Sequence, residues 1–174
     1  MPDFAFLRSV NLGKHNKVPM KDLVALISER GWGPVSYLLA SGNLVFPQGA
    51  PADVRAGLKE LIRNEFDVDT DVIMRTGAEL GKLLENNPYG VPKEGSVQIA
   101  IWDGAADSDG LCGLLEADHH PDRLHQADNA LIIRYAGTSH DSKLNNNLVS
   151  RRLKVASTLR NVKTFIRLLE RERL

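Results

Sequence analysis

The same order of secondary-structure elements occurs twice along this chain, and no other feature of the sequence restricts its fold as strongly. Apolar residues alternate or run together where strands are expected, and they recur three and four residues apart where helices are expected. The first pass consists of a strand, a helix, two strands, a second helix and a fourth strand. These elements are expected at residues 4–10, 20–30, 35–40, 44–46, 54–66 and 71–74.

Two local signals support these boundaries. Pro19 suits the first turn of a helix, and Gly31 can take the positive φ angle that is common just beyond a helix end. Ser41-Gly42-Asn43 separates the second and third strands, and glycine and asparagine tolerate the backbone angles that tight hairpin turns require.

The second pass repeats this order after a connecting helix. Thr76 and Glu79 form a capping box that opens the connecting helix, which is expected to end before Asn87-Pro88. A strand, a helix, two strands, a helix and a weak final strand follow, and a C-terminal helix closes the chain. We expect these elements at residues 97–102, around 111–115, at 123–127 and 130–135, from about Ser142, and at 155–158 and 162–169.

Two split βαβ patterns predict an α+β protein with two four-stranded antiparallel sheets, each carrying two helices on one face. The predicted units are residues 1–76 and residues 77–174, and the second includes the connecting helix and the C-terminal helix. The sequences of the two halves show no visible similarity. The prediction of a repeat therefore depends on the order of elements alone.

The composition excludes several classes of protein. The 174 residues include 22 basic and 22 acidic side chains, so no overall charge attracts the chain to nucleic acid or to an anionic membrane. There is no apolar run of about 18 residues and no charged-then-apolar leader, which argues against membrane insertion and secretion. Cys112 is the single cysteine and cannot form an internal disulfide. We therefore expect a reduced, cytoplasmic setting.

The loop after the first strand contains side chains that can hold a polar ligand. The first and second strands of a split βαβ sheet run in the same direction, so residues 11–17 should lie near residues 41–43 at one edge of the sheet. Gly13 would allow close approach of the backbone, and Lys14 and Lys17 would supply positive charge. Hydrogen-bonding groups would come from Asn11, Asn16, Ser41 and Asn43. The alternative is an ordinary exposed loop, because these residue types are common in turns.

Two further features could contribute to a site. Alternation places Arg8 on the same face of the first strand as Phe4 and Phe6, either as a paired structural ion or as part of a site. Lys143 precedes residues 145–147, three asparagines on the helix expected from about Ser142. A helix start favours anions, so this segment is a second candidate patch, and its alternative is a solvated helix start.

Other groupings do not indicate chemistry. A dense run of potential metal ligands matches no known ligand spacing, and we predict no metal there. It consists of Asp118, His119, His120, Asp122, His125 and Asp128. His140-Asp141-Ser142 contains the residue types of a catalytic triad, but sequence neighbours rarely form that geometry, and helix capping by Asp141 or Ser142 is the better interpretation. No cofactor fingerprint is present, and no cofactor is expected.

Nucleic-acid binding is a competing hypothesis, because the common RNA-binding module has the same sheet topology and stacks bases on aromatic side chains of its central strands. Phe4, Phe6 and Phe46 could form such a surface. The third strand lacks the basic-glycine-aromatic signature of that module, and the net charge is zero. We therefore expect these rings to be buried.

Five short motifs, which together span nearly the whole chain, are shared with a known family. They are Leu7–Gly13, His15–Met20, Ser41–Phe46, Ser142–Asn146 and Arg160-Asn161. In these residues the chain resembles the DUF1697 family of bacterial proteins, a domain of unknown function. The resemblance implies two ferredoxin-like units of order βαββαβ, and it implies no activity.

The chain departs from the family pattern at three places. Lys14 stands where the family often has glycine, Asn145 where threonine is usual, and Val162-Lys163 where tryptophan and asparagine are usual. The resemblance also adds Arg160 and Asn161 to the candidate site.

The leading functional hypothesis is a cytoplasmic binding protein for a phosphorylated or otherwise anionic ligand, such as a nucleotide or a nucleic-acid backbone, at the loop edge of the N-terminal sheet. One alternative is an enzyme acting on a small molecule, with Arg8 and Lys143 stabilising charge and His15 carrying a proton. The other is a protein–protein interaction module. The candidate ligand-binding residues are Arg8, Asn11, Gly13, Asn16, Lys17, Ser41, Gly42, Asn43, Lys143, Asn146, Arg160 and Asn161. The sequence does not determine the oligomeric state.

Overall fold

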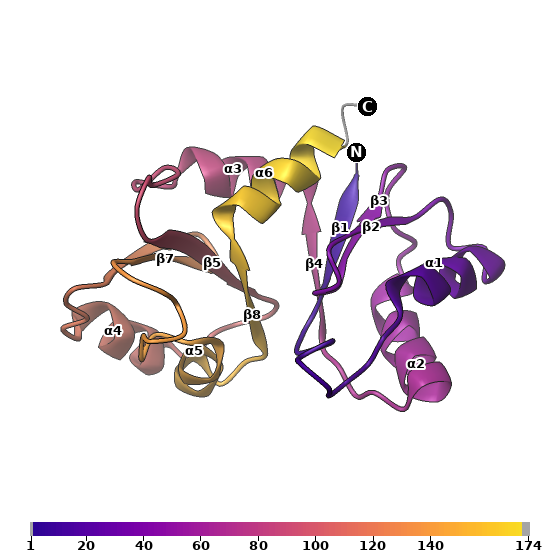
Figure 1. Cartoon of the computed structure of the whole chain (residues 1–174), viewed down its shortest axis with the longest axis horizontal. Coiled ribbons are helices and arrows are strands. Elements are labelled where there is room, and N and C mark those ends of the chain that lie inside the picture. Colours follow the sequence, from indigo (N-terminus) through magenta and orange to yellow (C-terminus); the bar gives the residue numbers. More distant parts are fainter. Residues whose placement is uncertain (1, 172–174) are drawn as a thin grey trace. The chain divides into compact units, whose positions relative to one another are not determined.

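The apolar pattern of the N-terminal half forms a four-stranded sheet with two helices on one face (Figure 1). The computed structural model describes residues 2–171. The elements of this half are β1 (Asp3–Leu7), α1 (Met20–Glu29), β2 (Ser36–Leu38), β3 (Asn43–Phe46), α2 (Val54–Phe66) and β4 (Val72–Thr76). The strand order is β2-β3-β1-β4, and every neighbouring pair is antiparallel. Because β1 and β2 both pair with β3, they run in the same direction, as predicted.

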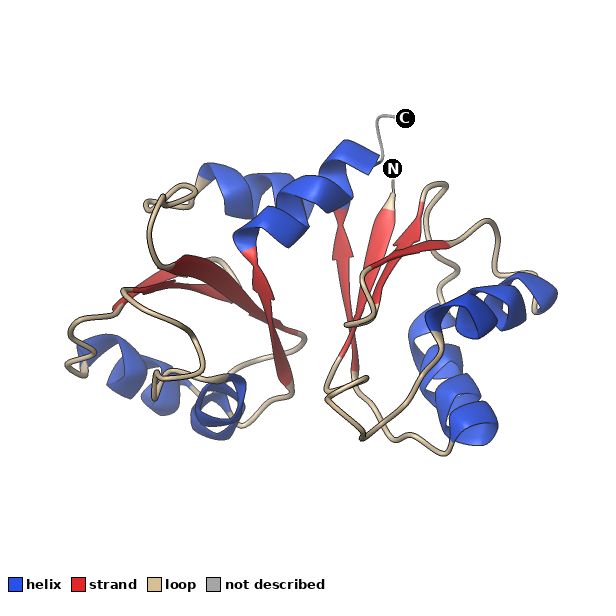
Figure 2. Ribbon diagram, in the orientation of Figure 1, coloured by secondary structure: helices blue, strands red, loops and turns tan. Residues whose placement is uncertain are grey.

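The core of this first unit lies between the sheet and its helices (Figure 2). Leu7 and Phe46 from the strands meet Leu23 of α1 and Leu58 of α2, and all four side chains are fully buried. Burying one such side chain stabilises a fold by about 1.5–3 kcal/mol. The packing therefore fixes the orientation of both helices against the sheet.

The C-terminal half forms a second sheet with the same topology. Its elements are β5 (Ser96–Trp102), α4 (Ser108–Glu116), β6 (Arg123–Ala127), β7 (Ala130–Tyr135), α5 (Asn146–Leu153) and β8 (Ser157–Asn161). The order β6-β7-β5-β8 corresponds strand for strand to that of the first sheet. Trp102, Leu131 and Tyr135 of the sheet belong to one buried core with Val149 and Leu153 of α5. The predicted α+β fold with two ferredoxin-like units is confirmed.

One further helix follows the fourth strand of each sheet. The α3 helix (Gly77–Glu85) follows β4, and α6 (Val162–Arg171) follows β8. By packing, the first unit extends to Leu80 and includes residues 168–171, whereas the second extends from Gly81 to Arg167. The division therefore falls within these helices, whereas the sequence analysis placed it after Thr76. No helix among residues 2–171 is long and apolar enough to cross a membrane.

The starts of these two helices are built in similar ways. The Thr76 N–H and hydroxyl both donate to Glu79 Oε2, at 2.7 and 2.9 Å, and the Glu79 N–H donates to Thr76 Oγ1, which confirms the predicted capping box. At the start of α6, Asn161 Oδ1 accepts a hydrogen bond from the Lys163 N–H at 2.9 Å.

The corresponding positions of β4 and β8 in the two sheets allow the sequences that run from these strands into the following helices to be compared. When the segment from Arg75 is aligned with the segment from Arg160, identical residues coincide in the strand and in the following helix. The identical pairs are Arg75 and Arg160, Leu83 and Leu168, Leu84 and Leu169, and Glu85 and Glu170. Both arginines donate to the carbonyl of the preceding residue, Met74 or Leu159. The two units therefore share residues as well as topology.

The structure corrects three local predictions. The α5 helix begins at Asn146, not near Ser142, because the Asn145 side chain caps it by accepting the Leu148 N–H at 3.0 Å. Capping by Asp141 or Ser142 was therefore wrong, and the Ser142 hydroxyl instead donates to Asp122. The β8 strand begins at Ser157 rather than at residue 155.

The first strand is also shorter than predicted. It ends at Leu7, and Ser9 has a positive φ of 56°, which extended strands do not adopt. Arg8 consequently lies outside the strand, and the alternation that grouped it with Phe4 and Phe6 does not extend to it. Phe4, Phe6 and Phe46 are fully buried, as expected, and buried rings offer no face to a nucleic-acid base.

Candidate functional site

The loop after β1 lies against the hairpin that joins β2 to β3, as the strand directions predicted. Asn11 Nδ2 donates to the Ala40 carbonyl at 2.7 Å, and the Leu7 N–H donates to the Gly42 carbonyl at 2.8 Å. Residues far apart in the sequence therefore form one rim at this edge of the first sheet.

Asn11 joins the parts of this rim together. Besides its bond to Ala40, its Nδ2 group donates to the Val18 carbonyl at 2.8 Å, and its Oδ1 accepts the Val18 N–H at 2.9 Å. Both amide donors are thus used within the fold. Asn11 also has a φ of 54°, a conformation that asparagine tolerates better than most residues.

We expect Asn11→Asp to lower the free energy of unfolding by about 2 kcal/mol. A carboxylate cannot donate to the Val18 and Ala40 carbonyls, and its negative charge would be repelled by both carbonyl oxygens. Urea unfolding followed by circular dichroism measures this change. Asn16→Asp is the matched control, since Asn16 has a similar φ of 50° but donates only one bond, to the Ser9 carbonyl at 2.9 Å. Equal losses in the two variants would contradict the clamping role of Asn11.

The hairpin residues of the predicted site are also used by the fold. Asn43 is fully buried, and its Nδ2 group donates to the Leu38 carbonyl at 2.7 Å and to Ser41 Oγ at 3.1 Å. Gly42 is buried against Leu7 and Val10. Ser41 is exposed. These contacts explain Gly42 and Asn43 as structural residues of the turn.

A groove of about 490 Å³ opens beside this rim, and we name it the α1 groove. It lies between the loop after β1, the strand β2 and the first turn of α1. Its lining consists of Asn11, Lys17, Val18, Pro19, Met20, Lys21, Asp22, Tyr37 and Ala40. Of the residues selected from the sequence, this groove brings together Asn11 and Lys17.

Two lysines and the first turn of α1 bring positive charge to the lining of the α1 groove. Pro19 precedes α1 and provides no side-chain cap, so the first N–H groups of the helix have no side-chain acceptor there. Lys17 and Lys21 are both exposed beside this turn, and Lys17 Nζ donates to the Gly13 carbonyl at 2.6 Å. Asp22 is the one acidic residue of the lining and partly offsets the two lysines. A helix start with two lysines favours a bound anion.

Other predicted residues of the first unit lie outside this groove. Lys14 and His15 are exposed on the loop, and Gly13 has open space around its Cα. Arg8 is half-buried, and its backbone carbonyl accepts a hydrogen bond from Thr70 Oγ1 at 2.7 Å. The role of these residues in binding stays a prediction.

The four candidates of the second unit have contacts of their own. Lys143 is exposed, whereas Asn146 Oδ1 accepts a hydrogen bond from Ser157 Oγ at 3.0 Å and ties α5 to β8. Burial lowers the pKa of Arg160 to about 10, which leaves the guanidinium charged at neutral pH. It donates to Thr158 Oγ1 at 2.6 Å. Asn161 caps α6, and ligand binding by all four stays a prediction.

The run of acidic and histidine residues between 118 and 128 is accounted for by local hydrogen bonds. Asp118 accepts the His120 N–H, the His119 ring bonds to the Leu114 carbonyl, and Asp122 accepts the Ala136 N–H. Among residues 2–171 no group of three or more such side chains could hold a metal ion.

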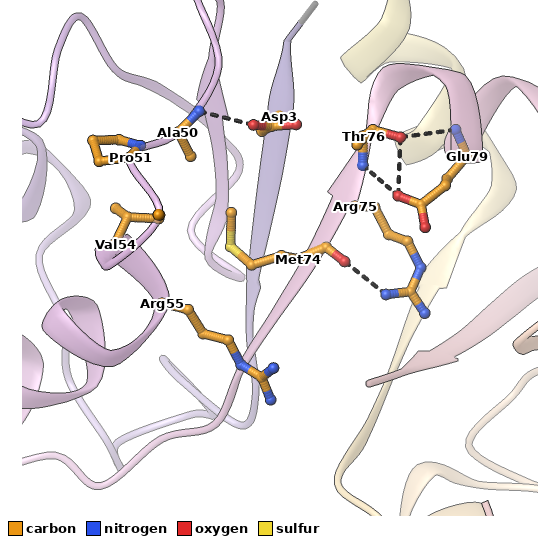
Figure 3. Close-up of a pocket in the computed structure, with 10 residues that line it drawn as sticks. Asp3, Ala50, Pro51, Val54, Arg55, Met74, Arg75, Thr76 and Glu79 are labelled. Carbon is orange, nitrogen blue, oxygen red and sulfur yellow. Dashed lines mark hydrogen bonds between the residues drawn. The ribbon is translucent and has the colours of Figure 1, made fainter. Parts of the chain in front are cut away.

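A second groove, of about 270 Å³, lies where β1 begins and β4 ends, at the opposite end of these strands from the loop after β1 (Figure 3). Its polar groups already serve the fold. Asp3 accepts the Ala50 N–H at 2.8 Å, Glu79 caps α3, and Arg75 donates to the Met74 carbonyl at 2.6 Å. Because these polar groups are used by the fold, the α1 groove is the better candidate site. No histidine lines either groove.

Comparison with known proteins identifies the family. The model of the family described as "Protein of unknown function (DUF1697)" matches residues 2–131. The chain belongs to the DUF1697 family. A solved structure of a conserved bacterial protein from Streptococcus pneumoniae has 21% sequence identity and a TM-score of 0.68, with 98% of each chain covered. That similarity supports the fold of this DUF1697 protein over its full length. No curated protein matches the chain.

Sequence reasoning did not find Lys21, Asp22 or Tyr37 in the candidate site of this DUF1697 protein. Lys21 and Asp22 had a signal, since they closely follow Pro19 and therefore lie in the first turn of a helix that continues from the predicted loop. Tyr37 had none, because only the tertiary structure places the β2 strand beside that turn.

Proposed function

We propose that this DUF1697 protein is a cytoplasmic binding protein for a small phosphorylated or otherwise anionic ligand that occupies the α1 groove. The proposal is supported by one observation above all: Lys17, Lys21 and the uncapped first turn of α1 line the same groove of about 490 Å³. Pockets for small molecules commonly have volumes of roughly 300–1,000 Å³. The anionic group is expected to lie beside the two lysines.

The proposal revises the set of residues selected from the sequence. It keeps Lys17 as a contact to the ligand and Asn11 as the residue that shapes the groove, and it adds Lys21. Asn43 and Gly42 are assigned to the turn, because both are buried.

Titration with propyl phosphate, followed by NMR, tests this proposal. At pH 8 this ester is a dianion, since the second pKa of a phosphate ester is about 6. We expect the amide signals of residues 20–22 to shift. Lys17→Met and Lys21→Met should each weaken binding about fivefold, the effect of one partly solvated charge a few ångströms away. Asp22→Asn should strengthen binding, because it removes the one repulsive charge of the lining.

Lys14→Met is the matched control. Lys14 is exposed in the same loop and carries the same charge, but it does not line the groove. Its replacement should leave the affinity within about twofold, because an exposed charge that does not contact the ligand interacts with it only weakly through water. If propyl phosphate produces no shifts at residues 20–22, or if Lys14→Met weakens binding as much as Lys17→Met, the proposed site is wrong.

A further inference from the structure

We infer that the ligand of the α1 groove carries an aromatic ring next to its anionic group, as an aryl phosphate or a nucleoside monophosphate does. The inference rests on the proposed function and specifies the part of the ligand that the lysines do not contact.

The size of the groove leaves room for a ligand larger than a simple anion. A phosphate ion is small, since it consists only of a phosphorus atom and the oxygens bonded to it. Pockets that hold whole small molecules have volumes of roughly 300–1,000 Å³, and the α1 groove, at about 490 Å³, falls within that range. An oxoanion beside Lys17 and Lys21 would therefore leave most of the groove to the remainder of the ligand.

The rest of the lining is suited to a flat apolar group. Besides the two lysines, the groove is lined by Pro19 and Ala40, which are exposed, and by the half-buried Tyr37 on β2. Val18 and Met20 also line it, although both side chains are largely buried in the core. Contact with such side chains would remove the apolar surface of a ligand from water, which favours binding in proportion to the area buried.

Tyr37 makes an aromatic ligand a better fit than an aliphatic one. Its backbone carbonyl accepts a hydrogen bond from the Arg171 guanidinium, which holds this part of the edge strand in place. Its hydroxyl has no hydrogen-bond partner among residues 2–171, although it belongs to a half-buried side chain. Aromatic rings attract one another beyond the effect of buried area, and a tyrosine hydroxyl can bond a ring nitrogen or a sugar hydroxyl.

The test compares phenyl phosphate with propyl phosphate at pH 8, where both are dianions with the same head group. We expect the full-length protein to bind phenyl phosphate about fivefold more tightly, within the range that one aromatic pair contributes. Tyr37→Leu keeps an apolar side chain at this position and should abolish the preference, so that the two esters bind with affinities within about twofold of each other. Tyr37→Phe keeps the aromatic ring and should retain the preference for phenyl phosphate.

Each outcome separates this inference from the proposed function. Equal affinities of the unmodified protein for the two esters would overturn the inference but leave the proposed anion site standing. A preference that persists in Tyr37→Leu would also overturn it, because the ring would then be recognised elsewhere. If neither ester shifts the signals of residues 20–22, the proposed function fails and the inference fails with it. Retention of propyl phosphate binding by Tyr37→Leu shows that this variant is folded.

Discussion

Gly42→Ala is expected to lower the free energy of unfolding by about 3 kcal/mol, combining backbone strain with overlap in the core. Gly42 has a φ of 81°, a conformation that side chains disfavour. A Cβ atom at this position would lie 2.7 Å from Leu7 Cβ and 2.9 Å from Val10 Cγ2. Neither neighbour can move freely, since both are buried and Leu7 pairs with the hairpin through its backbone. Urea unfolding measures the loss.

Gly13→Ala separates the two contributions. Gly13 also has a positive φ, of 55°, but a Cβ atom there would meet no atom within 4 Å. Only the backbone strain remains, and we expect a loss of about 1 kcal/mol. Should the two substitutions cost the same, the packing of the hairpin against β1 would be looser than the structure indicates.

The fold could be predicted from the sequence because its signals are local and agree with one another. Leu23 and Ile27 of α1 show helical spacing, and Ser41-Gly42-Asn43 marks the hairpin. Where the prediction was wrong, a competing interaction decides the structure. The α5 helix starts at Asn146 because Asn145 offers a cap one residue before it, whereas Ser142 is bonded to Asp122, twenty residues earlier in the chain. Such a long-range partner leaves no local signal.

The candidate site was only partly predictable for the same reason. Strand direction correctly placed the loop after β1 beside the β2–β3 hairpin, because topology alone determines which ends of the strands meet. The sequence could not distinguish asparagines that face a ligand from asparagines that hold a loop. Asn11 and Asn43 have the residue type expected of a ligand contact, yet their amides bond to backbone carbonyls of the rim.

The repeat could be predicted from the order of elements, whereas the four identical residues shared by the segments from Arg75 and from Arg160 were missed because they are few. Arg75 and Arg160 occupy the same position of the fourth strand, and both turn back to a backbone carbonyl. The two predicted patches differ in the structure: Lys17 of the first lines a groove, whereas Asn146 of the second is bonded to Ser157.

Gly110 and Gly113, both in α4, are expected to respond to alanine with opposite signs. A Cβ atom on Gly110 would lie 1.8 Å from the Arg152 carbonyl oxygen at the end of α5, a separation that no rearrangement of a side chain can relieve. The two helix ends would have to separate, which would disrupt the bond from the Asp107 N–H to the Leu153 carbonyl, 2.8 Å in length. We expect Gly110→Ala to lower the free energy of unfolding by at least about 3 kcal/mol, from overpacking and the lost hydrogen bond.

Gly113 faces open space, so its replacement should have only the effect of helix propensity. Alanine is favoured over glycine inside a helix by roughly 0.5–1 kcal/mol, and Gly113→Ala should therefore stabilise the protein by about that amount. The same change is made three residues apart in one helix, so effects on the unfolded chain are nearly equal and cancel in the comparison. Urea unfolding of both variants gives the difference directly. Stabilisation by both substitutions would mean that α4 and α5 do not approach each other at Gly110.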